Sequence, residues 1–195
     1  GNPGARYEGT RHNVGFMTVD RLADRDGAGF RKERFWNAER ARCRIRDHEV
    51  TLLKPLSYVN LSGPVVRKVS EDLEVERRDV LVVLDDFWLP LGRLRIRKQG
   101  GGGGHKGLDS VVRALASKEV ARLRIGIGSP QYGEAVDHVL SRFRTEERPI
   151  VTETIERAAD AVVVWASDGL DAAMNRFNQA PDEPSGEERS TPEGR

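Results

Sequence analysis

The sequence has very little cysteine and no long apolar run. Its single cysteine, Cys43, has no partner within the chain, so an internal disulfide is excluded and a reducing compartment is expected. No apolar run approaches the roughly 18 residues that a membrane-crossing helix needs, and no signal-peptide pattern is present. We therefore expect a cytoplasmic protein with no membrane partner. Its 195 residues suit a single domain that is large enough to bury a core.

A large excess of charge of either sign is also absent, since the net charge is +1. This charge is unevenly distributed along the chain. Residues 179–195 contain five acidic residues and two arginines, a net charge of −3, which leaves +4 on residues 1–178. The segment 179–195 is rich in Pro, Glu, Ser and Gly, and this composition predicts a disordered acidic tail. The positive remainder suits a polyanionic partner without identifying one.

Apolar periodicity predicts helices and strands in alternation. The helices are expected from residue 16 to near residue 27, at 64–73, directly after Gly107 with residues 111, 112, 115 and 116 inward, and at 146–167 and 170–177, with a short turn or helix at 139–143. The strands are expected at 35–46, 49–54, 79–84, 92–98 and 121–127. Ser62 is expected to cap the second helix, and residues 128–137 are expected to form a loop. This order predicts an α/β fold for residues 1–178, as a single domain with a mixed twisted sheet and helices on both faces, in three layers.

His12 and Asp85 are candidates for acid–base chemistry. His12 lies in a polar segment directly before a predicted helix, and an unperturbed imidazole, with a pKa of about 6.5, accepts a proton at neutral pH. Asp85 follows the continuous apolar run 79–84, which is typical of a strand covered on both faces. Strand ends line the ligand crevice of open α/β sheets, where a carboxylate can orient an imidazole. A surface histidine and an aspartate that caps a turn remain the alternatives.

Several other features have both a chemical and a structural interpretation. Asn2 and Asn60 are loop amides that can bind a water molecule or a carbonyl group, or simply form turns. Asp85 and Asp86 together suit a metal ion, but no second ligand cluster with suitable spacing is found, so we expect no metal and no other cofactor. The run Gly100–Gly104 lacks the spacing of nucleotide-binding loops. It is interpreted as a mobile wall without side chains that admits a bulky substrate, with a plain flexible loop as the alternative.

Cationic residues alternate with apolar residues on two neighbouring predicted strands. Such a cluster attracts phosphate oxygens with little base specificity, and a solvated strand face is the alternative. The residues concerned are Arg95, Arg97, Lys98, Arg122 and Arg124.

Six segments together resemble the bacterial peptidyl-tRNA hydrolase family. They occur in the order and spacing of that family, and the resemblance covers residues 1 to about 178. The segments are Gly-Asn-Pro-Gly (1–4) with Tyr7, Thr-Arg-His-Asn-Val-Gly-Phe (10–16), Lys-Pro-Leu-Ser-Tyr-Val-Asn-Leu-Ser-Gly (54–63), Leu-Asp-Asp-Phe-Trp-Leu-Pro-Leu-Gly (84–92), Gly-Gly-His-Lys-Gly-Leu (103–108) and Arg-Leu-Arg-Ile-Gly-Ile-Gly-Ser-Pro (122–130).

The resemblance implies a metal-independent esterase that cleaves the bond between a peptide and the 3′ ribose of tRNA, so that the tRNA is released for reuse. The enzyme is expected to be a monomer that binds the acceptor stem and 3′ end of peptidyl-tRNA. In this family the residues that match have three kinds of role. His12 matches the catalytic base, Asp85 its supporting carboxylate, and Asn2 the amide that distinguishes N-blocked from free aminoacyl substrates. Tyr7, Tyr58, Asn60 and Lys106 match substrate-contacting positions, and Arg95, Arg97 and Arg124 match basic residues that hold acceptor-stem phosphates.

The sequence departs from the family pattern at four positions. Val59 stands where Met is usual, Lys106 where Asn is usual, and Trp88 and Gly102 stand where Asp and His are more frequent. Lys106 can donate a hydrogen bond but cannot accept one. Lys106 and Val59 slightly favour a catalytically weak RNA-binding relative, similar to the splicing-factor branch of the superfamily. Retention of the four residues His12, Asp85, Asn2 and Asn60 favours the hydrolase more strongly.

The first residues also carry an expectation about the sheet. Gly1-Asn2-Pro3-Gly4 is a loop signature that most simply follows a strand. In the family that this sequence resembles, the strand that ends there is central. We therefore expect that a first strand is missing from this sequence, with a natural or processed start as the alternative. A true absence of this strand would leave a gap in the sheet.

Overall fold

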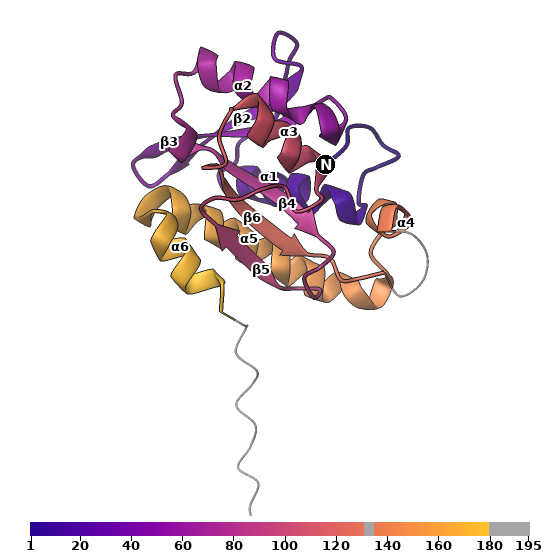
Figure 1. The fold of residues 1–195 in the computed structure, drawn as a ribbon. Helices are drawn as coiled ribbons and strands as arrows, with labels where there is room; N and C mark the ends of the chain where they lie inside the picture. The colour runs from indigo at the N-terminus through magenta and orange to yellow at the C-terminus, as the bar shows by residue number, and fades with distance from the viewer. Residues whose placement is uncertain (131–134, 180–195) are drawn as a thin grey trace, which may run out of the picture.

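The computed structural model describes residues 1–130 and 135–179. The acidic tail that is predicted to be disordered comprises residues 179–195, and from residue 180 onwards it lies outside this description. Along the described chain, single helices separate runs of three, two and one strands, and three helices follow the last strand (Figure 1). The helices are α1 (Val14–Arg25), α2 (Ser62–Asp72), α3 (Lys106–Ala114), α4 (Ala135–Leu140), α5 (Arg148–Asp168) and α6 (Leu170–Phe177). The strands are β1 (Arg31–Glu33), β2 (Ala38–Ile45), β3 (His48–Pro55), β4 (Leu81–Asp86), β5 (Leu94–Arg97) and β6 (Ala121–Gly126).

The strands form two sheets. In the first, β1, β2 and β3 are antiparallel neighbours in that order. In the second, the order is β4-β6-β5, with β4 parallel and β5 antiparallel to β6. The predicted α/β class and the mixture of strand directions are confirmed. The strands are divided between two sheets, however, instead of being joined in one.

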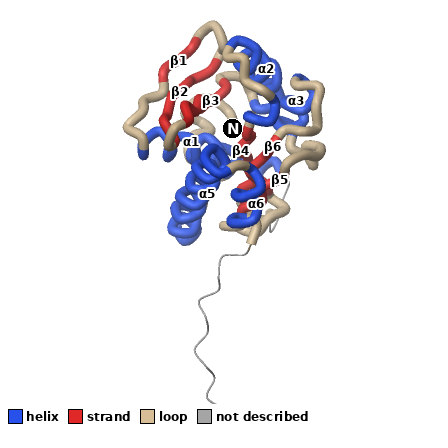
Figure 2. Tube along the Cα trace, turned by 90° about the vertical axis from the view of Figure 1, so that its left-hand side faces the viewer, coloured by secondary structure: helices blue, strands red, loops and turns tan. Residues whose placement is uncertain are grey.

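Helices cover both faces of the β4-β6-β5 sheet, as predicted. α2 and α3 pack together on one side, and α1, α5 and α6 lie on the other (Figures 1 and 2). Successive side chains of a strand point to opposite faces. Accordingly, Leu81 and Val83 join the main core beneath α1 and α5, whereas Val82 joins the cluster around Val111 of α3. Among the described residues no helix has the length and apolar character needed to cross a membrane.

A glycine allows α1 to lie directly against β4. A Cβ atom on Gly15 would overlap the carbonyl oxygen of Val83, so a larger residue would push the helix away from the strand. α1 begins at Val14, immediately after the 3-10 turn Arg11–Asn13. The close packing therefore brings this turn to the carboxyl end of β4.

Several local predictions are wrong. β1 (Arg31–Glu33) was not predicted, because its three charged residues show no apolar alternation. Ser62 is the first residue of α2 and not its cap, since the N-cap position is occupied by Leu61. β4 continues to Asp86, two residues beyond its predicted end, because its pairing with β6 continues. α4 begins at Ala135, within the segment that was expected to be a loop.

The two sheets leave a gap between β3 and β4. In the described part of the chain, β3 pairs only with β2 and β4 only with β6, so each strand has one unpaired edge. A cavity of about 760 Å³ is lined by apolar residues of both strands, including Leu52 and Val83, and also by Gly1.

Candidate active site

His12 and Asp85 meet at the carboxyl end of β4. His12 comes from the turn before α1, and Asp85 is the penultimate residue of the strand. Nδ1 of His12 lies 2.8 Å from Oδ1 of Asp85 although the residues are 73 positions apart. Both residues are buried, with exposed fractions of 7% and 3%. The two candidates that the sequence proposed separately therefore form one hydrogen-bonded pair.

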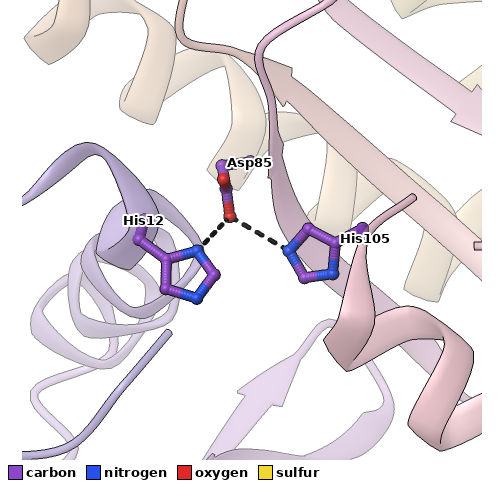
Figure 3. Close-up of side chains that lie close together, drawn as sticks. All are labelled: His12, Asp85 and His105. Carbon is purple, nitrogen blue, oxygen red and sulfur yellow. Dashed lines mark hydrogen bonds and ion pairs between the residues drawn. The ribbon is translucent and has the colours of Figure 1, made fainter. Parts of the chain in front are cut away.

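A second imidazole contacts the same carboxylate oxygen (Figure 3). Nε2 of His105 lies 3.2 Å from Oδ1 of Asp85, and Nδ1 of His105 accepts a hydrogen bond of 3.1 Å from the backbone N–H of Leu108. Because Nδ1 is an acceptor, the pattern of partners assigns the proton to Nε2, which donates to Asp85. The sequence interpretation missed this role. Two signals were available: His105 follows the glycine run directly, and it lies in the segment 103–108 that resembles the family.

Asp85 is an ionised acceptor for both rings. Burial alone would raise the pKa of this carboxyl group, but the hydrogen bonds from His105 and His12 outweigh burial and hold the pKa well below its usual range. His12 must therefore donate from Nδ1, which leaves the lone pair on its other nitrogen. That nitrogen, Nε2, lies on the side of the ring away from Asp85 (Figure 3). The arrangement provides a basic nitrogen whose ring is oriented by a carboxylate.

The same three side chains have the composition of a metal site. His12, Asp85 and His105 each offer a ligand atom, and these atoms lie within 4.8 Å of one another. The expectation that no ligand cluster exists is wrong, because it overlooked His105. A metal ion on Nε2 of His105 would need the lone pair of that nitrogen, which moves the ring proton to Nδ1, against the N–H of Leu108. The hydrogen bonds therefore favour a carboxylate with two imidazole donors over a set of metal ligands.

Arg11 fixes the turn that carries His12. Its buried guanidinium group donates to the carbonyl oxygen of Ile127 at 3.1 Å and to Oγ of Ser141 at 3.2 Å. It also forms an ion pair of 2.6 Å with Glu147, just before α5. These bonds tie one short turn to three distant segments. The sequence interpretation assigned no role to Arg11, because each partner is more than a hundred positions away.

Asn2 is held in one orientation beside the same turn. Its Oδ1 accepts a hydrogen bond of 2.9 Å from the backbone N–H of Val59. Its backbone N–H donates to Oδ1 of Asn13 at 2.8 Å, and its carbonyl oxygen accepts from Nδ2 of Asn13 at 2.9 Å. Because Oδ1 is used by Val59, Nδ2 is the group of Asn2 that can meet a substrate carbonyl. Asn13, which the sequence interpretation did not single out, is what joins Asn2 to His12.

The predicted substrate-contacting residues lie on the segments around this cluster. Tyr58 and Asn60 are both exposed. Tyr58 directly precedes the turn Val59–Leu61, Asn60 lies within it, and this turn packs against α3. Lys106 is the exposed first residue of α3. Tyr7 makes an edge-to-face contact with Tyr58, with ring centroids 6.4 Å apart.

The glycine run is held by two arginines instead of being free. Arg122 is only 2% exposed and donates to the carbonyl oxygens of the first two glycines, at 2.9 and 3.4 Å. Arg124 donates to the carbonyl oxygen of Gly102 and to Oδ2 of Asp86, both at 2.9 Å. The carbonyl groups of residues 100–102 are therefore bound to side chains of β6, and the predicted mobility of this wall stays a prediction.

The cationic cluster divides into exposed and internally bonded arginines. Arg95 and Arg97 are exposed on β5, opposite Arg124 and Arg122 in the register with β6. Arg122 is buried beneath the glycine run, and the guanidinium group of Arg124 forms an ion pair with Asp86. The neighbouring positions predicted for these strands are confirmed. Only Arg95 and Arg97, however, combine a place on these strands with an exposed side chain.

An imidazole that is oriented by a buried carboxylate, with its second nitrogen free, is a common device for activating a nucleophile. The α/β fold and this pair together define a candidate hydrolase. Comparison with known proteins specifies the class further. The family model described as "Peptidyl-tRNA hydrolase" matches residues 1–185.

This chain belongs to the peptidyl-tRNA hydrolase family. The peptidyl-tRNA hydrolase of Chloroflexus aggregans is 47% identical over 180 residues, which cover 91% of this chain and 95% of the relative. That of Syntrophomonas wolfei is 43% identical over 178 residues, covering 91% and 96% of the two chains. The crystal structure of peptidyl-tRNA hydrolase from Acinetobacter baumannii has a TM-score of 0.85 at 35% identity and covers 91% of each chain.

Proposed function

We propose that this protein hydrolyses the ester bond of peptidyl-tRNA, with His12 as the general base. The observation that carries the proposal is the buried hydrogen bond of 2.8 Å between Nδ1 of His12 and Asp85, which leaves Nε2 of His12 as a proton acceptor. Membership of the peptidyl-tRNA hydrolase family supports the choice of substrate.

The chemical step uses one water molecule. Nε2 of His12 takes a proton from the water as its oxygen attacks the ester carbonyl carbon, and Asp85 stabilises the imidazolium ion that forms. The tetrahedral intermediate then collapses. The bond to the ribose oxygen breaks, and the imidazolium returns its proton to that oxygen. The products are a peptide carboxylic acid, which loses its proton to solvent, and a tRNA with a free ribose hydroxyl group.

Amide donors around His12 support the intermediate and the choice of substrate. Nδ2 of Asn2 is the available donor of a side chain that is otherwise held by Val59 and Asn13. A donor directed at the developing oxyanion stabilises the transition state more than the substrate. We assign Asn2 to the recognition of an N-blocked aminoacyl group, and Asn60, Lys106, Tyr7 and Tyr58 to contacts with the peptide and the terminal ribose.

Binding of the nucleic acid requires no reading of base sequence, since every tRNA must be accepted. Arg95 and Arg97, exposed on β5, are suited to phosphates of the acceptor stem. Arg124 is assigned to the same task, with the qualification that its charge is shared with Asp86. The protein acts as a monomer in the cytoplasm, and the free, buried Cys43 is consistent with a reducing compartment.

The proposal is tested by release of the peptide from an N-acetyl-aminoacyl-tRNA. The wild-type protein is expected to release it, and His12→Ala to lower kcat by roughly 10²–10⁴, the contribution typical of a general base. Binding of tRNA to His12→Ala is expected to be largely retained, because His12 is buried and holds no phosphate. Measuring tRNA binding with the same His12→Ala preparation serves as the control for folding.

The competing function is RNA binding without efficient catalysis. A wild-type protein that binds N-acetyl-aminoacyl-tRNA and releases nothing would establish that alternative. Retention of full activity by His12→Ala would instead require a different base.

A further inference from the structure

Trp88 is an exposed aromatic residue beside the candidate active site. It is 73% exposed, and among the large hydrophobic residues of the described chain only Phe35, at 74%, is comparable. A large aromatic side chain in water gains stability when a partner covers it. The position of Trp88 indicates what that partner is.

The backbone of Trp88 is anchored to the strand that carries Asp85. Its N–H donates to Oδ1 of Asp86 at 2.9 Å, and the other oxygen of Asp86 is bound by Arg124. Only three peptide units separate Trp88 from Asp85, so their Cα atoms are at most about 11 Å apart. The ring of Phe87 lies 4.9 Å from the indole at an angle of 39° and restrains it.

The connection that contains Trp88 leads from the candidate catalytic carboxylate to the strand with exposed arginines. Asp85 of β4 and Leu94 of β5 are both register partners of Ile125 in β6. The end of β4 and the start of β5 therefore lie at the same end of the sheet, about 10 Å apart. A substrate that reaches from His12 to Arg95 passes the connection between these two strands, and that part of the substrate is nucleic acid.

We propose that the indole of Trp88 stacks on an unpaired nucleobase at the 3′ end of the tRNA. The inference rests on the proposed function. A single-stranded end exposes base faces that an indole can cover, and such stacking tolerates any base. Trp88 thus holds the strand between the ester at His12 and the phosphates at Arg95, without selecting one tRNA over another.

Tryptophan fluorescence tests binding directly, with the trinucleotide CpCpA as the probe. The chain has three tryptophans, of which Trp36 is 9% exposed and Trp165 is half-buried in α5. A saturable quenching by CpCpA in the wild-type protein, lost in Trp88→Phe, is the expected result. Absence of saturable quenching, or quenching that persists in Trp88→Phe, would overturn the proposal.

Kinetics with N-acetyl-aminoacyl-tRNA provide the second readout. Trp88→Ala is expected to raise KM roughly tenfold, the effect of losing one stacked base, with little change in kcat. Trp88→Phe keeps an aromatic ring, so its KM is expected to lie close to that of the wild type. Phe35→Ala is the matched control, because Phe35 is equally exposed but lies in the turn between β1 and β2, and its KM should equal that of the wild type.

Two further outcomes separate the possible failures. If KM of Trp88→Ala depends on the amino acid esterified to the tRNA, and an N-acetylated peptide amide quenches where CpCpA does not, Trp88 contacts the peptide and the stacking proposal fails. If CpCpA quenches normally but the wild-type protein releases no peptide, the hydrolase function fails and the stacking site stands.

Discussion

Asp85 accepts hydrogen bonds from two imidazoles through one oxygen, and the two rings have different tasks. His12 is oriented by the bond and keeps Nε2 free. His105 has both nitrogens engaged, one with Asp85 and one with the N–H of Leu108 at the start of α3. His105 is therefore a positioning residue, which fixes Asp85 and at the same time caps a helix.

Two substitutions separate these roles of His105. Asparagine is a good helix N-cap but is too short to reach Asp85 as the imidazole does, whereas alanine provides neither contact. Both variants are expected to lower kcat roughly tenfold, the effect of losing about 1.4 kcal/mol of support, with KM unchanged. Only His105→Ala should also lose about 1 kcal/mol of stability, measured by urea denaturation.

The comparison of kcat with stability decides the result. Full kcat in His105→Asn would mean that the imidazole serves only as a cap. An increase of KM in place of a loss of kcat would mean that His105 contacts substrate.

At the scale of elements, the glycine run is hydrogen-bonded to the start of α3. Gly102 donates its N–H to Oδ1 of Asp109 in the first turn of α3 at 3.0 Å, and its carbonyl oxygen is bound by Arg124. A Cβ atom at Gly102 would overlap the Asp109 carboxylate, whereas one at Gly101 would meet nothing within 4 Å. The start of α3, which carries His105, thus depends on the absence of a side chain at one particular glycine.

Gly102→Ala is expected to displace the first turn of α3 and to lower kcat/KM by roughly tenfold or more, as small misplacements of a catalytic group do. Gly101→Ala is the matched control and should retain wild-type kcat/KM and melting temperature. Peptide release and thermal unfolding of both variants are the measurements. Equal activity of the two would show that the run has no part in positioning His105.

The elements that the sequence predicts well are those with a strong local pattern. The apolar run that forms β4 and the long amphipathic α5 are examples. Burial on both faces of a strand predicts a continuous apolar run, and burial of one face of a helix predicts apolar residues at helical spacing. β1 consists of three charged residues and forms by pairing with the edge of β2. This pairing produces no local pattern in the sequence, so β1 could not be predicted.

The candidate site is predictable only in part for the same reason. His12 and Asp85 stand out because of where they lie relative to a helix and a strand, and because of the resemblance to a family. The contacts of Arg11, Asn13 and His105 join segments distant in sequence, so they depend on the tertiary structure alone.

At the scale of the whole molecule, two buried or half-buried carboxylates connect the site to the stability of the fold. Burial would raise the pKa of Glu147, but hydrogen bonds from Arg11 and Arg144 lower it. The pKa of Asp85 is likewise lowered, by His105 and His12. Each carboxylate therefore binds a proton less readily in the folded protein than in the unfolded chain.

This difference predicts acid sensitivity. Above about pH 5, roughly one unit above the pKa of about 4 of an ordinary carboxyl group, ionised Asp85 and Glu147 contribute their full stabilisation. As the pH falls below that value, the unfolded chain takes up protons that the folded protein does not, and the stabilisation is lost progressively towards the lower folded pKa. The free energy of unfolding of the wild-type protein, measured in urea, should therefore fall between pH 4.5 and pH 2.5, a range well below the pKa of about 6.5 of an ordinary histidine.

Asp85→Asn is the decisive variant, because its amide oxygen can still accept both hydrogen bonds while its charge is lost. Its unfolding free energy should fall less over the same range, by an amount of the order of 1–3 kcal/mol. Glu49→Gln, at a strongly exposed position of β3, is the control and should follow the wild-type curve. Parallel curves for wild type and Asp85→Asn would mean that the bonds from His12 and His105 do not favour the ionised form. The proposal that a permanently ionised Asp85 orients His12 would then have no support. In that case the pKa of Asp85 would be the same in the folded protein and in the unfolded chain, and the hydrogen bonds from its two donors would not stabilise the ionised form.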